Sequence, residues 1–118
     1  MLHLTPEMLV LSYALLRETT PFKSWKLPHP DAVGFQVSRT SDVCGQFWVD
    51  PAKQVPCIAI SGAAVSRLDT LVRIMAHEMI HLKQLLSKEN TKGNHNAEFK
   101  RRAAVVCRAH GFDPKLFV

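Results

Sequence analysis

The sequence predicts one α+β domain that spans residues 1–118. A helical pattern runs from residue 5 to about residue 17, short alternating strands follow between residues 33 and 61, and helical patterns return from about residue 66 onward. The chain is close to the commonest domain length, and its hydrophobic share of 47% is ordinary for a globular protein. We therefore expect a single hydrophobic core and no second domain.

The N-terminal segment carries the signals of a helix start. Thr5 can cap the helix, and Pro6 fits the first helical position because a proline has no N–H to satisfy there. Met8, Leu11 and Leu15 follow at helical spacing, which predicts an amphipathic helix to about residue 17 with these side chains on its apolar stripe. Residues 20–31 are rich in proline and are expected to form an irregular connection.

Three short segments have the composition of β-strands. Val33, Phe35 and Val37 alternate with small or polar residues, residues 45–49 form a second run, and residues 56–61 form a third with Ile58 and Ile60 on one face. Strands this short and joined by turns usually pair antiparallel, so we expect a three-stranded, mainly antiparallel sheet.

Two helices are predicted in the second half of the chain. Ser66 can cap a long helix that ends near Ser87, before the polar loop at residues 89–93. Asn94 or Asn96 can cap the last helix, and Gly111 is a typical residue for its C-terminal end.

Composition and cysteine spacing limit the class of protein. The net charge is +5, and Cys44, Cys57 and Cys107 are far apart with no Cys-x-x-Cys pair, which argues against a disulfide framework or a zinc ribbon. No stretch has the 18 or more apolar residues of a membrane span, and the N-terminus lacks a signal-peptide pattern. We therefore expect a cytoplasmic protein without membrane association.

The long helix contains a metal-binding motif, His77-Glu78-Met79-Ile80-His81. Residues four apart lie on one face of a helix, about 6 Å apart along its axis, so both imidazoles can reach one Zn²⁺. Glu78 lies beside them and can act on a water without being a ligand, which is the place of a catalytic general base. The motif can also arise by chance, but the apolar flanks predict a buried helix, where unpaired polar groups are costly.

A third ligand is expected from the start of the last helix. His95 follows His81 by fourteen positions and would leave one position open for water, as catalytic zinc sites do. Glu98 is the alternative third ligand, or it could orient a histidine by a hydrogen bond. We favour His95, and we predict that Phe99, one turn further on, packs the last helix against the motif helix.

Two segments together resemble the SprT-like zinc metallopeptidases. These are residues 76–81 and residues 93–99, which are similar to the family pattern of His-Glu-x-x-His, a loop, and His-Gly-x-x-Phe at the start of another helix. Asn96 stands where the family has glycine, and the sequence contains no cysteine-rich zinc ribbon of the kind that many members carry. The likeness covers roughly residues 1–112, and the length of the chain is similar to that of small bacterial or phage-encoded members.

The resemblance implies a small zincin-like fold and a peptidase. It implies that His77, His81 and His95 are zinc ligands, that Glu78 is the catalytic base, and that the substrate is a protein or peptide. Some relatives act on proteins crosslinked to DNA, which makes DNA association a further hypothesis. A zinc-dependent binding or regulatory module without proteolysis is the alternative function.

A basic face and three aromatic residues are further candidates for a functional role. The last helix has a basic face, which we interpret as a solvated surface, with nucleic-acid or acidic-substrate binding as the alternative. Tyr13 could stabilise an oxyanion, and Trp25 and Trp48 could form a substrate platform, but core packing is the expected role of all three. The basic face consists of Lys100, Arg101, Arg102 and Arg108.

Overall fold

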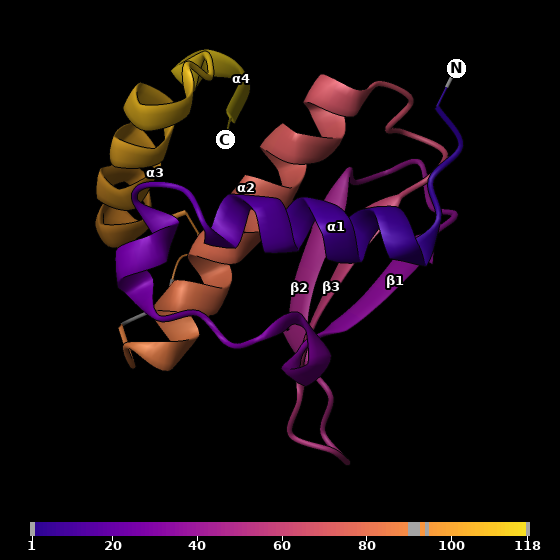
Figure 1. The fold of residues 1–118 in the computed structure, drawn as a ribbon, viewed down its shortest axis with the longest axis horizontal. Helices are drawn as coiled ribbons and strands as arrows, with labels where there is room; N and C mark the ends of the chain where they lie inside the picture. The colour runs from indigo at the N-terminus through magenta and orange to yellow at the C-terminus, as the bar shows by residue number, and fades with distance from the viewer. Residues whose placement is uncertain (1, 90–92, 94, 118) are drawn as a thin grey trace.

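A three-stranded sheet and the helices packed around it make up the fold (Figure 1), in a computed structural model that describes residues 2–89, 93 and 95–117. The α+β class predicted from the sequence is therefore confirmed. Asn94, one of the two caps considered for the last helix, lies outside the described residues. In chain order the elements are α1 (Pro6–Arg17), η1 (Phe22–Trp25), η2 (Pro30–Ala32), β1 (Gly34–Ser38), β2 (Gly45–Val49), β3 (Pro56–Ser61), α2 (Leu68–Leu86), α3 (Ala97–His110) and α4 (Pro114–Phe117).

Helix α1 begins as predicted but buries a different face. The Thr5 hydroxyl accepts a hydrogen bond from the Met8 N–H at 3.3 Å, and Pro6 is the first helical residue. Leu11 and Leu15, however, are 68% and 62% exposed, while the buried side chains are Leu9, Ser12, Tyr13 and Leu16. Of the predicted stripe only Met8 packs partly against the core, and the prediction was wrong for Leu11 and Leu15. Helix α1 carries apolar residues on several sides, so periodicity alone does not select the side that meets the core.

The sheet is mixed, which corrects the expectation of mainly antiparallel pairing. The strand order is β1-β3-β2, with β2 antiparallel to β3 and β1 parallel to β3. A tight turn at residues 50–55 joins β2 to β3, and such a local connection enforces antiparallel pairing. No local turn joins β1 to β3, so their direction is set by the longer path of the chain through β2.

Helices α1 and α2 cover the same face of the sheet. Phe35, Ile58 and Phe47 lie directly opposite one another across the three strands, so their side chains share a face. On that face the Phe35 ring contacts Tyr13 of α1, and the Phe47 ring stacks near His81 of α2. The core therefore lies between this face and the two helices, and the metal-binding motif lies at its edge beside β2.

The ends of the C-terminal helices differ in part from expectation. The N-cap of α2 is Arg67, without a side-chain cap hydrogen bond, so the predicted Ser66 cap was wrong. The N-cap of α3 is Asn96, whose side chain accepts from the Phe99 N–H at 3.0 Å, and α3 ends at Gly111 with φ of 75°, both as predicted.

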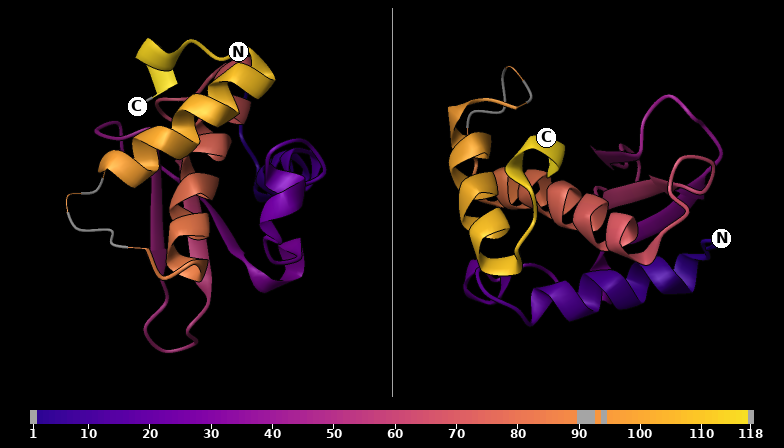
Figure 2. Two further views of the ribbon diagram at one scale, coloured as in Figure 1. Left: turned by 90° about the vertical axis from the view of Figure 1, so that its left-hand side faces the viewer. Right: turned by 90° about the horizontal axis from the view of Figure 1, so that it is seen from above.

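Helix α4 was not predicted from the sequence. It returns from the end of α3 to lie against α2 (Figure 2). In the part of the chain that the structure describes, none of these helices is long and apolar enough to cross a membrane.

Candidate metal centre

The structure brings the three predicted histidines together. His77 and His81 project from one face of α2, and His95 stands immediately before the N-cap of α3. One ring nitrogen from each of the three histidines lies within 4.8 Å of the other two. His77 Nε2 and His95 Nε2 are 3.1 Å apart. This cluster can hold a metal ion.

The donor set fits a tetrahedral transition-metal site. Two imidazole nitrogens bound at about 2.0–2.1 Å in tetrahedral geometry are roughly 3.3 Å apart, close to the spacing of the His77 and His95 nitrogens. The wider limit of 4.8 Å over the whole group means that at least one ring must turn slightly to close around an ion. Three neutral nitrogen ligands suit zinc and other late first-row metals better than calcium or magnesium, which prefer oxygen.

Phe99 forms a common packing surface for all three imidazoles. Its side chain is fully buried, and its ring centroid lies 4.5 Å from that of His95, 4.7 Å from His81 and 4.9 Å from His77. Contact with the Phe99 ring restricts the three imidazoles to a narrow range of rotamers. The predicted role of Phe99, packing α3 onto α2, is confirmed.

The orientation of His77 depends on a residue that sequence reasoning missed. His77 Nδ1 is 2.7 Å from the backbone carbonyl oxygen of Phe117 in α4. A carbonyl can only accept, so the proton must be on Nδ1, and Nε2 keeps its lone pair for a metal. Metal-ligating histidines usually have such a partner on the other ring nitrogen. Asp113-Pro114 is a helix-start signal that could have revealed α4, but not what its carbonyl contacts.

Burial keeps the histidines neutral. It lowers the pKa of His77 and of His81 from 6.5 to about 4, and it also lowers the pKa of His95. The neutral imidazole is the form that binds metal, so all three side chains have free lone pairs at pH 7.

Glu78 is buried beside the histidines and faces β2. The residue is only 4% exposed, and this burial raises the pKa of its carboxyl from 4.5 to about 8. A carboxyl with a pKa near neutrality can both take up and release a proton, which is what a general acid–base catalyst requires.

Gly45 of β2 leaves the space that the Glu78 carboxylate occupies. A Cβ atom at Gly45 would lie 2.8 Å from Glu78 Oε2 and 2.7 Å from Ile74 Cγ2. Any other residue there would push the carboxylate or the helix away. Sequence reasoning missed this residue, since a glycine at the start of a strand carries no signal of its tertiary neighbours.

A cavity of about 860 Å³ opens beside the histidines. It is bordered by four consecutive residues of β2, Gly45 to Trp48, and continues past Gln36 of β1. Trp48 is half-buried and lines this cavity, so the expectation that it packs in the core was wrong. The other lining residues are Val43, His77, Glu78, His81, Leu85 and His95.

The remaining candidates lie elsewhere. Tyr13 is fully buried and donates a hydrogen bond to the Pro28 carbonyl at 2.6 Å, so it serves the core as expected. The Glu98 carboxylate forms an ion pair with Arg101 and is not a member of the histidine cluster, which argues against Glu98 as the third ligand. Trp25 packs against Phe22 at a ring distance of 5.0 Å and does not line the cavity.

Comparison with known proteins adds no identification. No protein-family model matches this chain, and no curated protein has a significantly similar sequence.

Proposed function

We propose that this protein is a zinc-dependent peptidase of the SprT-like kind. The observation that carries the proposal is the position of Glu78, a buried carboxyl beside three converging histidines at the wall of a cavity. A site that only stores or binds a metal has no need for a protonatable carboxyl there. A catalytic site does, because the attacking water must lose a proton and the leaving amine must gain one.

His77, His81 and His95 would hold the ion, leaving a fourth position open. Zinc bound there would supply a Lewis acid that lowers the pKa of a water towards about 7 and polarises a scissile carbonyl. The imidazoles keep their orientation through Phe99 and the Phe117 carbonyl, so little rearrangement of the protein is needed.

Glu78 would act as the general base. Its carboxylate accepts a proton from the attacking water and later donates it to the nitrogen of the leaving group. Packing against Gly45 holds the carboxylate at the cavity wall. In the metal-free protein, burial keeps bulk water from solvating it and raises its pKa to about 8.

The cavity suits an extended polypeptide as substrate. Strand β2 is at the edge of the sheet, and an edge strand presents backbone N–H and C=O groups that can pair with another chain. The same strand lines the cavity from Gly45 to Trp48. A peptide added along this edge would run past Glu78 and the histidines, so its backbone carbonyls would reach the proposed metal.

The substitution Glu78→Gln tests the proposal. The amide has the shape of the carboxyl but cannot accept a proton, so hydrolysis of an unfolded protein such as casein should fall by about 100-fold or more. Zinc affinity should be nearly unchanged because Glu78 is not a ligand. Rates are compared for wild type and variant after removal of metal and reloading with Zn²⁺.

Glu98→Gln is the matched control for this experiment. Glu98 is also a glutamate near the site, but its carboxylate pairs with Arg101, so this variant should keep the wild-type rate. Equal hydrolysis by wild type and Glu78→Gln would remove Glu78 from the mechanism. Zinc binding without hydrolysis in wild type would instead favour the non-proteolytic binding module.

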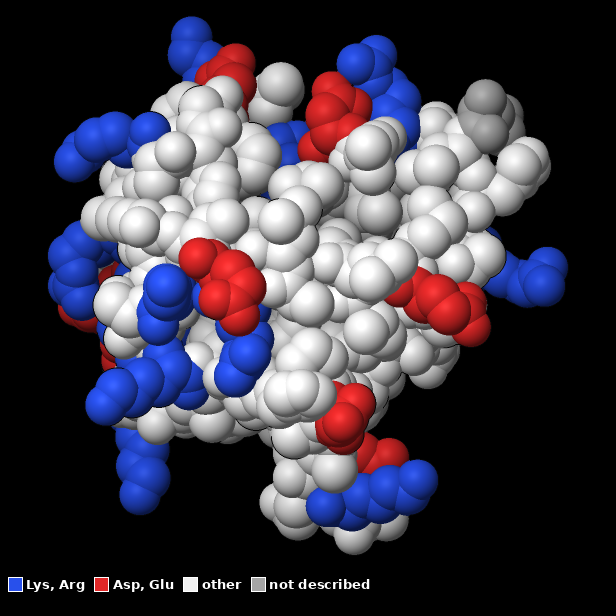
Figure 3. Space-filling view, in the orientation of Figure 1, with Lys and Arg blue, Asp and Glu red and all other residues white. Residues whose placement is uncertain are grey.

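DNA association remains a prediction for the basic face of α3. Lys and Arg side chains gather at the side of the molecule where α3 lies, with acidic residues among them (Figure 3). Arg101 and Arg102 each form an ion pair, with Glu98 and Glu89, so half of this face is already neutralised within the chain. A steep decrease of DNA affinity with salt would support phosphate contacts.

A further inference from the structure

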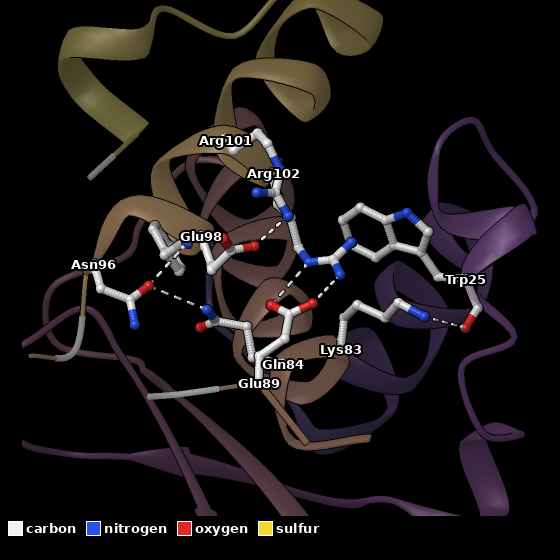
Figure 4. Close-up of polar contacts among 9 residues, drawn as sticks. Trp25, Lys83, Gln84, Glu89, Asn96, Glu98, Arg101 and Arg102 are labelled. Atoms are coloured by element: carbon white, nitrogen blue, oxygen red, sulfur yellow. Dashed lines mark hydrogen bonds and ion pairs between the residues drawn. The ribbon is translucent and has the colours of Figure 1, made fainter. Parts of the chain in front are cut away.

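A set of polar side chains joins the end of α2 to α3 (Figure 4), and it includes Asn96, the residue that follows the third histidine in sequence. The Arg102 guanidinium of α3 meets the Glu89 carboxylate just beyond α2 through two hydrogen bonds, with Nε donating to Oε1 at 3.2 Å and Nη2 donating to Oε2. We call this pair the Glu89–Arg102 clamp. Its two side chains are only 15% and 18% exposed.

The clamp is anchored to the N-terminal part of the chain. The Arg102 guanidinium lies over the Trp25 ring, 5.3 Å from its centroid, and Lys83 of α2 donates to the Trp25 carbonyl at 3.3 Å. Trp25 is itself packed on the buried ring of Phe22. Arg102 is therefore fixed from two sides, and its fork geometry defines the direction from which Glu89 must approach.

A second contact lies closer to the metal centre. The fully buried Gln84 side chain of α2 donates through Nε2 to Asn96 Oδ1 at 3.4 Å, and the same oxygen accepts from the Phe99 N–H that it caps. Asn96 is the residue next to His95. The contact thus ties the start of α3 to the same end of α2 that the clamp holds.

His95 depends on these contacts more than the other two histidines do. His77 and His81 are fixed by the backbone of one helix, whereas His95 lies outside any helix, between Glu89 and Arg102 in sequence. Its distance from the pair on α2 is set by how α3 docks against the end of α2. The neighbouring Glu98–Arg101 pair cannot serve this purpose, since both of its members are in α3 and are 40% and 62% exposed.

We propose that the Glu89–Arg102 clamp positions His95 for metal binding. The inference rests on the proposed metal-dependent function. A largely buried ion pair adds little net stability because desolvation offsets much of its attraction. The two hydrogen bonds between the Arg102 guanidinium and the Glu89 carboxylate nevertheless restrict the two groups to one relative geometry. Here the restricted pair joins the end of α2 to α3, and its two members lie before and after His95 in the sequence. Glu89 and Arg102 are thus positioning residues that act through His95 without touching the metal.

Zinc affinity of the metal-free protein, measured by competition with a chromophoric chelator, tests the clamp. Glu89→Gln and Arg102→Lys should each weaken Zn²⁺ binding by about 10- to 100-fold, the range usual for groups that orient a ligand. Arg102→Lys keeps the charge and most of the stem, so it remains informative if Glu89→Gln folds poorly. Glu98→Gln, which breaks only the exposed pair, should leave the affinity within about 3-fold of wild type.

A double-substitution cycle with His95→Ala shows whether the clamp acts through His95. If it does, adding Glu89→Gln to His95→Ala should cause no further loss of zinc affinity. The absorption spectrum of the Co²⁺-loaded protein should also shift in Arg102→Lys towards that of His95→Ala, since both alter the same ligand. A merely structural pair would lower thermal stability without changing this spectrum.

Each outcome distinguishes this inference from the proposed function. The role of the clamp would be overturned if Glu89→Gln lowered zinc affinity equally with and without His95, or if neither Glu89→Gln nor Arg102→Lys lowered it. Casein hydrolysis by the wild type would still leave the peptidase proposal standing. A wild-type protein that binds neither Zn²⁺ nor Co²⁺ would overturn both.

Discussion

At the scale of single residues, different contacts orient the three histidines of the site. His77 is held by its hydrogen bond to a backbone carbonyl, His81 by the helix that bears it, and His95 by packing on Phe99. The ring of Phe99 lies against all three. The Glu78 carboxylate occupies space that is open only because Gly45 has no side chain. The site is therefore sensitive to residues that perform no chemistry.

The third ligand provides the first prediction at this scale. His95→Ala should weaken zinc binding by more than about 100-fold, beyond the range of changes around a ligand, because one of three protein ligands is lost. Glu98→Ala should change the affinity far less, since the Glu98 carboxylate pairs with Arg101. Both affinities can be measured by competition titration. A larger loss of zinc affinity in Glu98→Ala than in His95→Ala would mean that Glu98, and not His95, is the third ligand.

Gly45 provides the second prediction. In Gly45→Ala the new methyl group would collide with the Glu78 carboxylate and with Ile74, at a cost of about 1–3 kcal/mol of stability. Hydrolysis should decrease more than zinc affinity, because Glu78 moves while the histidines stay. Gly62→Ala is the control: its new methyl group would lie 3.1 Å from Val37, a residue that does not line the cavity, so activity should remain. Equal activity in the two variants would mean that the carboxylate can adjust freely.

At the scale of elements, the site is a junction of α2, α3, α4 and β2. Helix α2 supplies two histidines and the carboxyl, and α3 brings the third histidine and Phe99. Strand β2 forms the cavity wall. Helix α4 is short but accepts two hydrogen bonds from α2, since Arg73 donates to the Leu116 carbonyl and His77 Nδ1 donates to the Phe117 carbonyl. The orientation of His77 thus depends on whether α4 is docked.

Loss of α4 docking should weaken the metal site. Phe117 is 2% exposed and packs on Phe112 and His77, so Phe117→Ala should release α4 and break the hydrogen bond to His77. Zinc affinity should fall by about 10- to 100-fold. The Nδ1–H proton of His77 should also exchange faster with water in an NMR spectrum.

Leu116→Ala is the matched control for α4. Leu116 is next to Phe117 but is 62% exposed, and its backbone carbonyl is unchanged by the substitution. Wild-type zinc affinity is expected. If Phe117→Ala binds zinc as tightly as Leu116→Ala does, the Phe117 carbonyl does not orient the ligand.

At the scale of the whole molecule, burial shifts the pKa values of the histidines and of Glu78 in opposite directions. Burial lowers the pKa of His77 and His81 to about 4 and raises that of Glu78 to about 8. In the metal-free protein each shift reflects burial that disfavours the charged form. A metal ion binds the neutral imidazoles of the folded chain better than it binds the unfolded chain, so it should raise the melting temperature, and a chelator should reverse the effect.

These shifts predict how the stability of the metal-free protein depends on pH. For the histidines the unfolded chain binds protons more tightly, so their effect lowers stability as pH falls from 6.5 towards 4. For Glu78 the folded chain binds the proton more tightly, so stability is lost as pH rises from 4.5 through about 8. Above pH 6.5 only the Glu78 effect of these three remains.

Melting temperatures of chelated protein between pH 6.5 and 9 check this prediction. Glu78→Gln is neutral at every pH, so its melting temperature should decrease less over this range than that of wild type. Glu98→Gln should follow wild type. Parallel curves for wild type and Glu78→Gln would show that Glu78 is already ionised in the folded protein at pH 6.5.

The sequence by itself determined the local features of this protein. The Thr5-Pro6 helix start, the residues of β2 and β3, the Asn96 cap and the end of α3 at Gly111 follow from interactions within a few residues. The spacing of His77 and His81 is likewise local, because the helix repeat alone places them on one face. His95 could be predicted as their partner from the motif, and the structure places it there.

Only the tertiary structure decided the features that depend on distant parts of the chain. The parallel pairing of β1 with β3 and the buried face of α1 depend on which surfaces meet, which no local pattern specifies. The same holds for the Phe117 carbonyl on His77, the space at Gly45 and the Glu89–Arg102 clamp. A backbone carbonyl or a missing side chain has no sequence signature, because its effect arises solely from what packs against it.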